Sequence, residues 1–226
     1  MPQRKIILAT NQIYHVFNRS IGEANIFSSL REHSRFLQLI EFYRFASLNI
    51  SFSHFKRLRA DIKQAYIENL KKSKKYRVEV LAFCLMPNHF HLLLTQVENN
   101  GISKMLADLE NSYVKFYNLR NNRAGPLFQS RFKAVRIETD EQLLHVSRYI
   151  HLNPITSYLI GPENIESFLF SSFRSYLNLD TTHDLINSSL ILDLVGGAKK
   201  YRKFVLDQVD YQRELAQLKH LTLENP

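Results

Sequence analysis

The sequence predicts an α+β fold of the ferredoxin-like type, with a four-stranded antiparallel sheet. Four β-branched or aromatic runs alternate with helical patterns in the order β-α-β-β-α-β. A Met-Pro-Asn turn at 86–88 joins the two middle runs into a hairpin. A further amphipathic stretch follows the fourth run. Because both crossover helices of this topology lie on one face, the other face is free for a site.

The first half of the chain contains one strand and two helical stretches. Residues 13–18 are β-branched and aromatic and predict the first strand. Apolar residues at helical spacing predict a helix over 34–48. Residues 55–75 form a second helical stretch that is strongly basic and ends in the run Lys71–Lys75. We interpret that run as a solvated helix end, with phosphate contact as the less favoured alternative.

The second half completes the sheet and adds helices. We expect strands over 77–85 and 89–95, an amphipathic helix over 102–118 and a fourth strand over 132–137. Asp140 is expected to cap a helix that runs to about Leu152 and ends at Asn153–Pro154. Short helices are expected over 171–179, 190–195 and 199–218. We therefore divide the chain into a main domain, 1–160, with a helical insertion at about 49–76, and a helical C-terminal extension, 161–226.

The composition excludes two classes of protein and favours a polyanionic partner. The 226 residues are 45% hydrophobic and 23% charged, which excludes wholesale disorder. No apolar run approaches the ~18 residues of a membrane span. One cysteine, Cys84, allows no intrachain disulfide and favours a cytoplasmic location. The net charge of +9 and the 27 Phe and Tyr residues suit single-stranded nucleic acid, although a merely basic soluble protein fits the charge equally well.

Two histidines alternate along the predicted third strand. In His89-Phe90-His91 the two imidazoles share one face of the sheet, whereas Phe90 faces the helices. Two imidazoles at i and i+2 can bind one metal ion. Because His-x-His also occurs by chance, the pattern alone is a weak indication.

The helix after the fourth strand offers two more candidates. Tyr149 and Asn153 are four residues apart and share one helical face. If that helix packs on the open face of the sheet, Asn153 can supply an oxygen ligand to the same ion, and the Tyr149 hydroxyl can attack a phosphate. The structural alternative is a half-buried packing tyrosine and an ordinary Asn-Pro helix end.

Three segments together resemble a known family. They are Met86-Pro-Asn-His-Phe-His-Leu-Leu-Leu94, Gly125-Pro-Leu-Phe-Gln-Ser-Arg-Phe132 and Arg148-Tyr-Ile-His-Leu-Asn-Pro154. In this order they resemble the single-tyrosine HUH transposases, and most closely the REP-associated tyrosine transposases. The stretches 14–19 and 170–176 fit the same family, so the resemblance covers roughly residues 10–178. The lengthened segment 49–76 and the tail after Leu179 depart from compact members.

The resemblance implies a fold, a reaction and a site. It implies that His89 and His91 bind a divalent ion, Mg²⁺ or Mn²⁺, with Asn153 completing the metal shell. It implies that Tyr149 cuts single-stranded DNA at hairpin-containing ends and keeps a 5′-phosphotyrosine link, which a free 3′-OH later reverses. The expected partner is single-stranded DNA, with no membrane, and the protein is expected to be a monomer or a homodimer.

Other residues near these motifs have both a functional and a structural interpretation. Four basic residues flank the predicted turn and fourth strand and are expected to hold the substrate backbone, with general solubility as the alternative: Arg123, Arg131, Lys133 and Arg136. Tyr113 and Tyr117 are expected on the covered face of the sheet. His15 can reach the metal region but is better explained as a sheet histidine, and His145 is either a support for Tyr149 or exposed.

Three functions remain open at this point. The first is a metal-dependent transposase that nicks and joins single strands. The second is a non-catalytic nucleic-acid-binding protein on the same fold. The third is a metal-dependent nuclease that uses water, with Tyr149 structural. A covalent protein–DNA adduct separates the first function from the other two.

Overall fold

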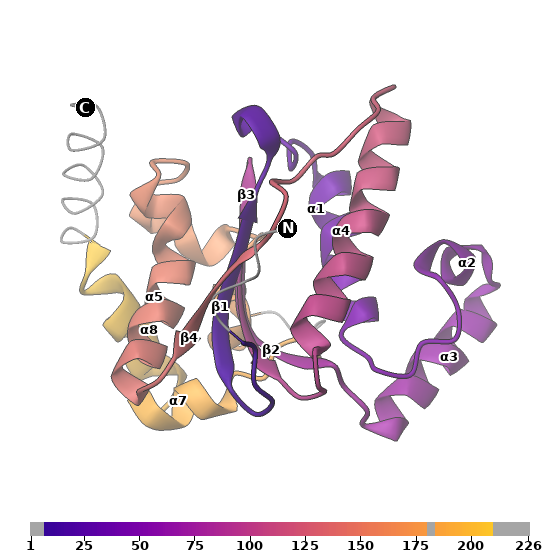
Figure 1. The fold of residues 1–226 in the computed structure, drawn as a ribbon. Helices are drawn as coiled ribbons and strands as arrows, with labels where there is room; N and C mark the ends of the chain where they lie inside the picture. Colours follow the sequence, from indigo (N-terminus) through magenta and orange to yellow (C-terminus); the bar gives the residue numbers. More distant parts are fainter. Residues whose placement is uncertain (1–6, 180–183, 210–226) are drawn as a thin grey trace.

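The computed structural model describes residues 7–179 and 184–209. A four-stranded sheet separates two helical layers (Figure 1). The strands are β1 (Ile13–Arg19), β2 (Val78–Met86), β3 (His89–Gln96) and β4 (Lys133–Ile137). The longer helices are α1 (Leu30–Tyr43), α3 (Ala60–Ser73), α4 (Gly101–Arg120) and α5 (Asp140–Thr156). The short helices are η1 (Ile21–Glu23), α2 (Phe52–Arg57), η2 (Pro162–Ser167), α6 (Phe173–Tyr176), α7 (Ser189–Val195) and α8 (Ala198–Leu206).

The sheet has the order β2-β3-β1-β4, and every neighbouring pair is antiparallel. This is the strand order of a ferredoxin-like βαββαβ unit, so the predicted fold class is confirmed. In β2 a register shift between Val80 and Ala82 changes the face to which the later residues point. Phe83 and Leu85 therefore pack with α1 and α4, whereas Cys84 and Met86 face α5.

Two hydrophobic cores lie on the two faces of the sheet. Phe90, Leu92 and Leu94 of β3 belong to the core shared with α1 and α4. Leu93 belongs to the other core, which α5, α7 and α8 complete with Ile150, Ile191 and other apolar side chains. In Figure 1 α5, α7 and α8 accordingly lie on one side of the sheet, and α1 and α4 lie on the other. The face that the topology leaves free is thus covered by the helix that carries Tyr149.

Several predicted helix boundaries are wrong, each for a local reason. Helix α1 begins at Leu30 rather than at Ser34, because Ser29 and Glu32 form a reciprocal capping box at its N-terminus. It ends at Tyr43, before the expected end at Leu48. The basic stretch 55–75 is two helices, because Leu58 and Arg59 have extended backbone angles between α2 and α3. Extended residues cannot continue the backbone hydrogen-bonding pattern of a helix.

Helix α5 differs from its prediction at both ends. Its N-cap is Thr139, whose Oγ1 accepts a hydrogen bond from the Gln142 backbone, so Asp140 is the first helical residue rather than the cap. The helix continues through Pro154 to Thr156. A proline so close to the C-terminus removes only one backbone hydrogen bond, so the helix absorbs it. The expected helix over 199–218 is observed only as α8, which begins at Ala198 and ends at Leu206. Residues 210–218 lie outside the described part of the chain.

Candidate active site

The pairing of β1 with β3 places four side chains on the face that α5 covers. Arg19 lies directly opposite His89 and Phe17 lies opposite His91. Opposed residues of an antiparallel pair point to the same face, so these side chains point the same way. They line a pocket of about 490 Å³ together with Tyr149 and other residues. The other lining residues are Asn18, Gln129, Lys133, Asn153, Thr156 and Ser157.

His89 is held in one tautomer by its neighbour. Its Nδ1 lies 2.6 Å from the side-chain oxygen of Asn88. An amide oxygen only accepts hydrogen bonds, so Nδ1 carries the proton and Nε2 keeps its lone pair. Burial, with a smaller contribution from the positive charge of Arg19, lowers the pKa of His89 to about 4. The imidazole is therefore neutral at pH 7, which is the form that ligates metals.

His91 is buried and contacts a third histidine, His15. Its Nδ1 lies 2.9 Å from Nε2 of His15, and their ring centroids are 5.1 Å apart. Burial, followed by the charges of His15, His89 and Arg19, holds the pKa of His91 well below its usual value. Burial lowers the pKa of His15 to about 4. All three imidazoles are therefore neutral at pH 7, and His15 is more than an isolated sheet histidine.

Helix α5 brings Tyr149 over this histidine group. The centroid of the Tyr149 ring lies 5.6 Å from that of His91 and 5.9 Å from that of His15. Burial raises the pKa of the Tyr149 phenol, while a hydrogen bond from Asn153 and the charge of Arg19 lower it in part. The Asn153 amide nitrogen also donates to the Tyr149 carbonyl, which leaves the Asn153 side-chain oxygen to accept or to ligate. The structure thus brings together all four residues singled out in the sequence.

The donor set fits a divalent ion held by two imidazoles and an amide oxygen. His89 and His91 are neutral, and the side-chain oxygen of Asn153 suits a hard cation. Within residues 7–179 and 184–209, no group of three or more His, Cys, Asp and Glu side chains is placed to hold a metal. An ion here would therefore depend on the amide and on oxygens of water or substrate for its other ligands.

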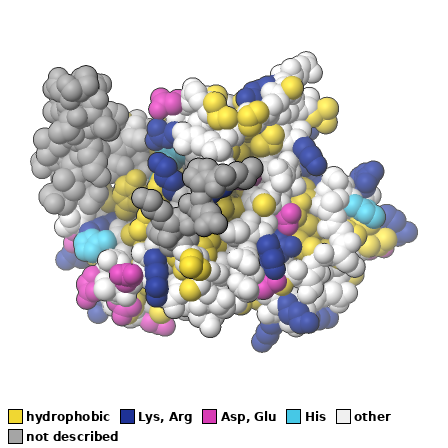
Figure 2. All heavy atoms as spheres, viewed as in Figure 1, with side chains coloured by type: hydrophobic (Ala, Val, Ile, Leu, Met, Phe, Trp, Pro, Cys, Tyr) yellow, Lys and Arg dark blue, Asp and Glu magenta, His cyan; other side chains and the backbone are white. Residues whose placement is uncertain are grey.

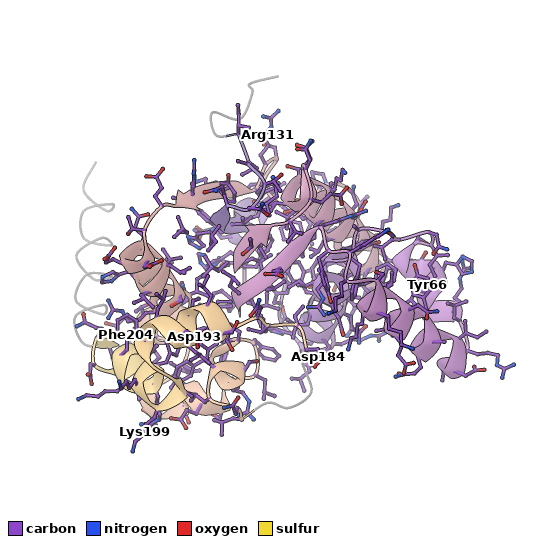
Figure 3. All side chains as sticks on the ribbon, turned by 90° about the horizontal axis from the view of Figure 1, so that it is seen from below. Tyr66, Arg131, Asp184, Asp193, Lys199 and Phe204 are labelled. Carbon is purple, nitrogen blue, oxygen red and sulfur yellow. The ribbon has the colours of Figure 1, made fainter. Side chains whose placement is uncertain are left out.

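The four basic residues expected to hold DNA occupy different places. Lys133 lines the pocket and lies 6.0 Å from the centre of the Phe17 ring. Arg136 is exposed and donates to Gln12. Arg123 donates to Asn118 and to the Pro126 carbonyl, so it ties the loop after α4. Arg131 borders a separate pocket beside Glu110 and projects at an edge of the molecule in Figure 3.

The two rival tyrosines lie on the covered side of the sheet, as the sequence predicts. Tyr113 is fully buried in the core on the α1–α4 side, and its hydroxyl donates to the Ile26 carbonyl. Tyr117 extends from the same helix to the Asn25 carbonyl. His145 is exposed and lies 2.7 Å from a guanidinium nitrogen of Arg148. Cys84 is buried, and burial raises the pKa of its thiol.

Sequence reasoning did not identify Arg19 as a site residue. Arg19 is the last residue of β1, and its charge acts on His89, His91 and Tyr149 alike. The signal that identifies it is alternation along β1, which puts residues 15, 17 and 19 on one face. The sheet order then sets that face against the histidine pair of β3.

The pocket combines side chains from the sheet and from the helix that covers it. An antiparallel ferredoxin-like sheet carries paired histidines that face a tyrosine on a covering helix, as the motifs imply. Residues 51–153 match the family described as "Transposase IS200 like". The resemblance to transposases that the motifs indicate is thereby confirmed.

A solved structure has the same fold. It is a REP-associated tyrosine transposase bound to a REP hairpin. Its sequence is 15% identical to this chain, and the TM-score between the two structures is 0.53. The similarity covers 84% of this chain and 96% of that chain. No curated protein sequence matches the chain. Among the described residues, no helix combines the length and the apolar character that a membrane crossing requires.

Proposed function

We propose that the chain is a metal-dependent transposase that cuts and rejoins single-stranded DNA through a covalent bond to Tyr149. One observation carries the proposal. The Tyr149 ring lies 5.6 Å, between centroids, from His91 in a pocket that also contains His89 and Asn153. A nucleophile beside neutral imidazoles and a side-chain oxygen is the arrangement that metal-assisted phosphoryl transfer requires.

In this proposal His89, His91 and Asn153 hold the ion, Mg²⁺ or Mn²⁺. When bound, such an ion polarises the phosphoryl oxygens and neutralises charge that develops on them. The Tyr149 oxygen attacks the phosphorus, the bond from phosphorus to the 3′-oxygen breaks, and the DNA 5′-phosphate stays on Tyr149. The phenol loses its proton, and the departing 3′-oxygen gains one. A free 3′-OH reverses the step, so no external energy source is needed.

The cations of the pocket have a part in this step. Arg19 and Lys133 line the same pocket as Tyr149, where they can bind phosphate oxygens on either side of the cut. Burial raises the pKa of Tyr149, and the positive charge of Arg19 offsets part of that rise, which favours the phenolate that attacks. Pockets of this volume hold small ligands, which suits one unstacked nucleotide better than an intact duplex.

The proposed substrate is single-stranded DNA that carries a hairpin. The structurally similar transposase is bound to a REP hairpin, which supports this choice. We further propose that residues 1–160 are the catalytic unit and that 161–226 are an extension that holds α5. Helices α7 and α8 pack on α5, and the Tyr201 hydroxyl lies 2.8 Å from Nδ1 of His151.

The test is covalent capture of labelled DNA. The protein is incubated with labelled single strands that contain hairpins in the presence of Mn²⁺, and denaturing electrophoresis detects an adduct. EDTA should abolish the adduct, and so should His89→Ala or His91→Ala, while most DNA affinity remains. Asn153→Ala should be milder, because water can replace one neutral oxygen ligand. An adduct that forms at full rate in EDTA contradicts the metal-dependent reaction.

A further inference from the structure

The positive charge of the chain is concentrated in one segment. Residues 51–77 contain nine of the 30 Lys and Arg residues but only two of the 21 Asp and Glu residues. The segment therefore carries +7 of the net charge of +9, and the rest of the chain is close to neutral. Since the proposed active site uses only Arg19 and Lys133, most of the excess charge has no part in that site.

This segment forms α2 and α3, which lie on the far side of the molecule from α5. Figure 1 shows both helices beyond the α1–α4 layer, whereas α5 covers the opposite face of the sheet. Figure 3 shows the same separation, with Tyr66 of α3 at one end and Phe204 of α8 at the other. A strand bound in the Tyr149 pocket therefore cannot touch α2 and α3 at the same nucleotide.

Five cations of this segment are exposed and form no ion pair with a described residue. They are Lys56, Arg57, Lys72, Lys74 and Lys75, which we name the α2–α3 basic surface. Three further cations of the segment do form ion pairs: Arg59 with Asp61, Lys71 with Asp184 and Arg77 with Asp108. Figure 2 shows dark blue side chains gathered over α2 and near the lower end of α3. Lys56 and Arg57 thus lie at the end of α2, just before α3 begins, and the three lysines lie at the C-terminal end of α3, a helix about 20 Å long.

Helix dipoles explain only part of this charge. Lysine and arginine in the last turn of a helix are favourable, and Lys56, Arg57 and Lys72 lie in last turns. Lys74 and Lys75 lie beyond the helix, and Lys63 is near its N-terminus, where a cation is unfavourable. Burial, followed by the charges of Arg35 and Lys63, lowers the pKa of Lys56. The like charges of Arg35 and Lys63 therefore add to the effect of burial, and neighbouring like charges favour a bound anion.

The aromatic side chains of α2 and α3 already pack against one another and against Phe42 of α1. The ring of Phe42 lies 5.3 Å from Phe52 and 5.1 Å from Phe55, and Phe55 lies 5.8 Å from Tyr66, between centroids. Rings packed in this way offer no platform for stacking unpaired bases. Cations without a stacking platform bind the phosphate backbone, which is the mode of sequence-independent duplex binding.

We propose that the α2–α3 basic surface binds the phosphate backbone of duplex DNA, as a second nucleic-acid site apart from the Tyr149 pocket. It would hold the duplex that flanks or follows the single-stranded substrate. Two linked contacts raise the effective concentration of the second, so long DNA should bind more tightly than a short strand. The proposal does not depend on the reaction at Tyr149, because duplex binding is measured without cleavage.

The test compares paired charge removals in the full-length protein. Lys72→Gln with Lys75→Gln neutralises one end of the surface, and Lys56→Gln with Arg57→Gln neutralises the other. Lys74 is left in place because its φ of 50° is left-handed. Lys115→Gln with Lys199→Gln is the matched control, since it removes two exposed cations, from α4 and α8, that form no ion pair with a described residue. Fluorescence anisotropy with a labelled duplex of about 30 base pairs then gives the affinity as a function of salt.

Each surface variant should bind this duplex about tenfold more weakly than the control at low salt, with a salt slope smaller by about 0.9 per lost phosphate contact. Surface variants that match the control in affinity and in salt slope overturn the proposal. A loss that appears only with vesicles of phosphatidylcholine and phosphatidylserine also overturns it, because the partner would then be a membrane. Duplex binding needs no adduct, so a failed adduct assay leaves this result unaffected.

Discussion

Nε2 of His15 lies 2.9 Å from Nδ1 of His91, so the two imidazoles share one hydrogen bond beneath the pocket. Either of the two ring nitrogens can carry the proton of this hydrogen bond. If His91 is to bind an ion through Nε2, its Nδ1 must carry the proton and donate it to His15. The side chain of His15 then orients His91 in the way that outer partners orient metal-bound histidines.

This relationship predicts that His15 controls metal affinity without binding the ion. His15→Ala should weaken Mn²⁺ binding about 10–100-fold, the usual cost of losing such a partner. His15→Gln should recover much of the loss, because its side-chain oxygen can accept from His91. Electron paramagnetic resonance of free Mn²⁺ during a titration measures both constants. If His15→Ala binds Mn²⁺ like the unaltered protein, the hydrogen bond has no such role.

A buried carboxyl predicts how stability depends on pH. Glu110 accepts a hydrogen bond from Asn18, and burial raises its pKa to about 7, with that hydrogen bond lowering it in part. In the unfolded chain the pKa of a glutamate is about 4.3. Between these values the folded state holds a proton that the unfolded state has lost, so the free energy of unfolding falls as pH rises.

Glu110→Gln should remove this decrease in the free energy of unfolding with rising pH. The variant should match the unaltered protein near pH 4 and be more stable than it near pH 8, because no charge then forms in the buried site. Urea denaturation at several pH values measures the difference in the free energy of unfolding. A difference that does not grow across this range would show that Glu110 titrates normally.

The tail should stabilise the helix that carries Tyr149. His151 of α5 is fully buried, and its two ring nitrogens lie 2.8 Å from the Tyr201 hydroxyl and 2.8 Å from Oγ of Ser172. Burial lowers the pKa of His151 to about 3, so it acts as a neutral link at pH 7. Tyr201→Phe leaves the ring in place but removes this partner and the bond to Ser147. We expect a loss of about 1–3 kcal/mol in the free energy of unfolding, which thermal and urea denaturation both report.

Tyr66→Phe is a matched control for this change. The Tyr66 hydroxyl donates to Asn49 at an exposed position on α3, so its removal should cost much less. Equal losses in the free energy of unfolding for the two variants would show that the buried link between α5 and α8 does not stabilise the fold.

Arg19 should matter to the reaction more than Lys133 does. Arg19 acts electrostatically on His89, His91 and Tyr149, whereas Lys133 only lines the same pocket. Arg19→Gln should slow adduct formation about 10–100-fold, in line with the loss of one preorganised charge near a developing anion. Lys133→Gln should mainly weaken DNA binding and reduce its salt dependence. Single-turnover rates at saturating DNA separate the two effects, and equal rates for both variants would contradict the distinction.

The parts of the fold that follow from local periodicity were predictable. Alternation alone puts His89 and His91 on one face, and the topology alone leaves that face for the helix with Tyr149. The structure has both features. The residues at which α1 and α5 begin depend on single side chains, the Ser29–Glu32 capping box and the Thr139 cap. Other residues nearby have similar capping side chains, so the sequence alone does not decide between them.

The features that were missed depend on contacts between distant segments. The role of Arg19 requires the register between β1 and β3, and the link between His151 and Tyr201 joins residues 50 positions apart. Pro154 was expected to end α5, but packing of the last turn in the core keeps Ile155 helical. Tertiary packing therefore decided these positions against local preference.

The central claim is tested most directly by mapping the adduct to one tyrosine. Tyr149→Phe removes one oxygen, so it should preserve folding and DNA binding while it eliminates the covalent adduct. Tyr117→Phe, which changes a tyrosine on the other side of the sheet, should leave the adduct in place. Digestion of the adduct followed by mass spectrometry should find the 5′-phosphate on Tyr149. A phosphate on any other tyrosine, or an adduct that persists in Tyr149→Phe, would contradict the account.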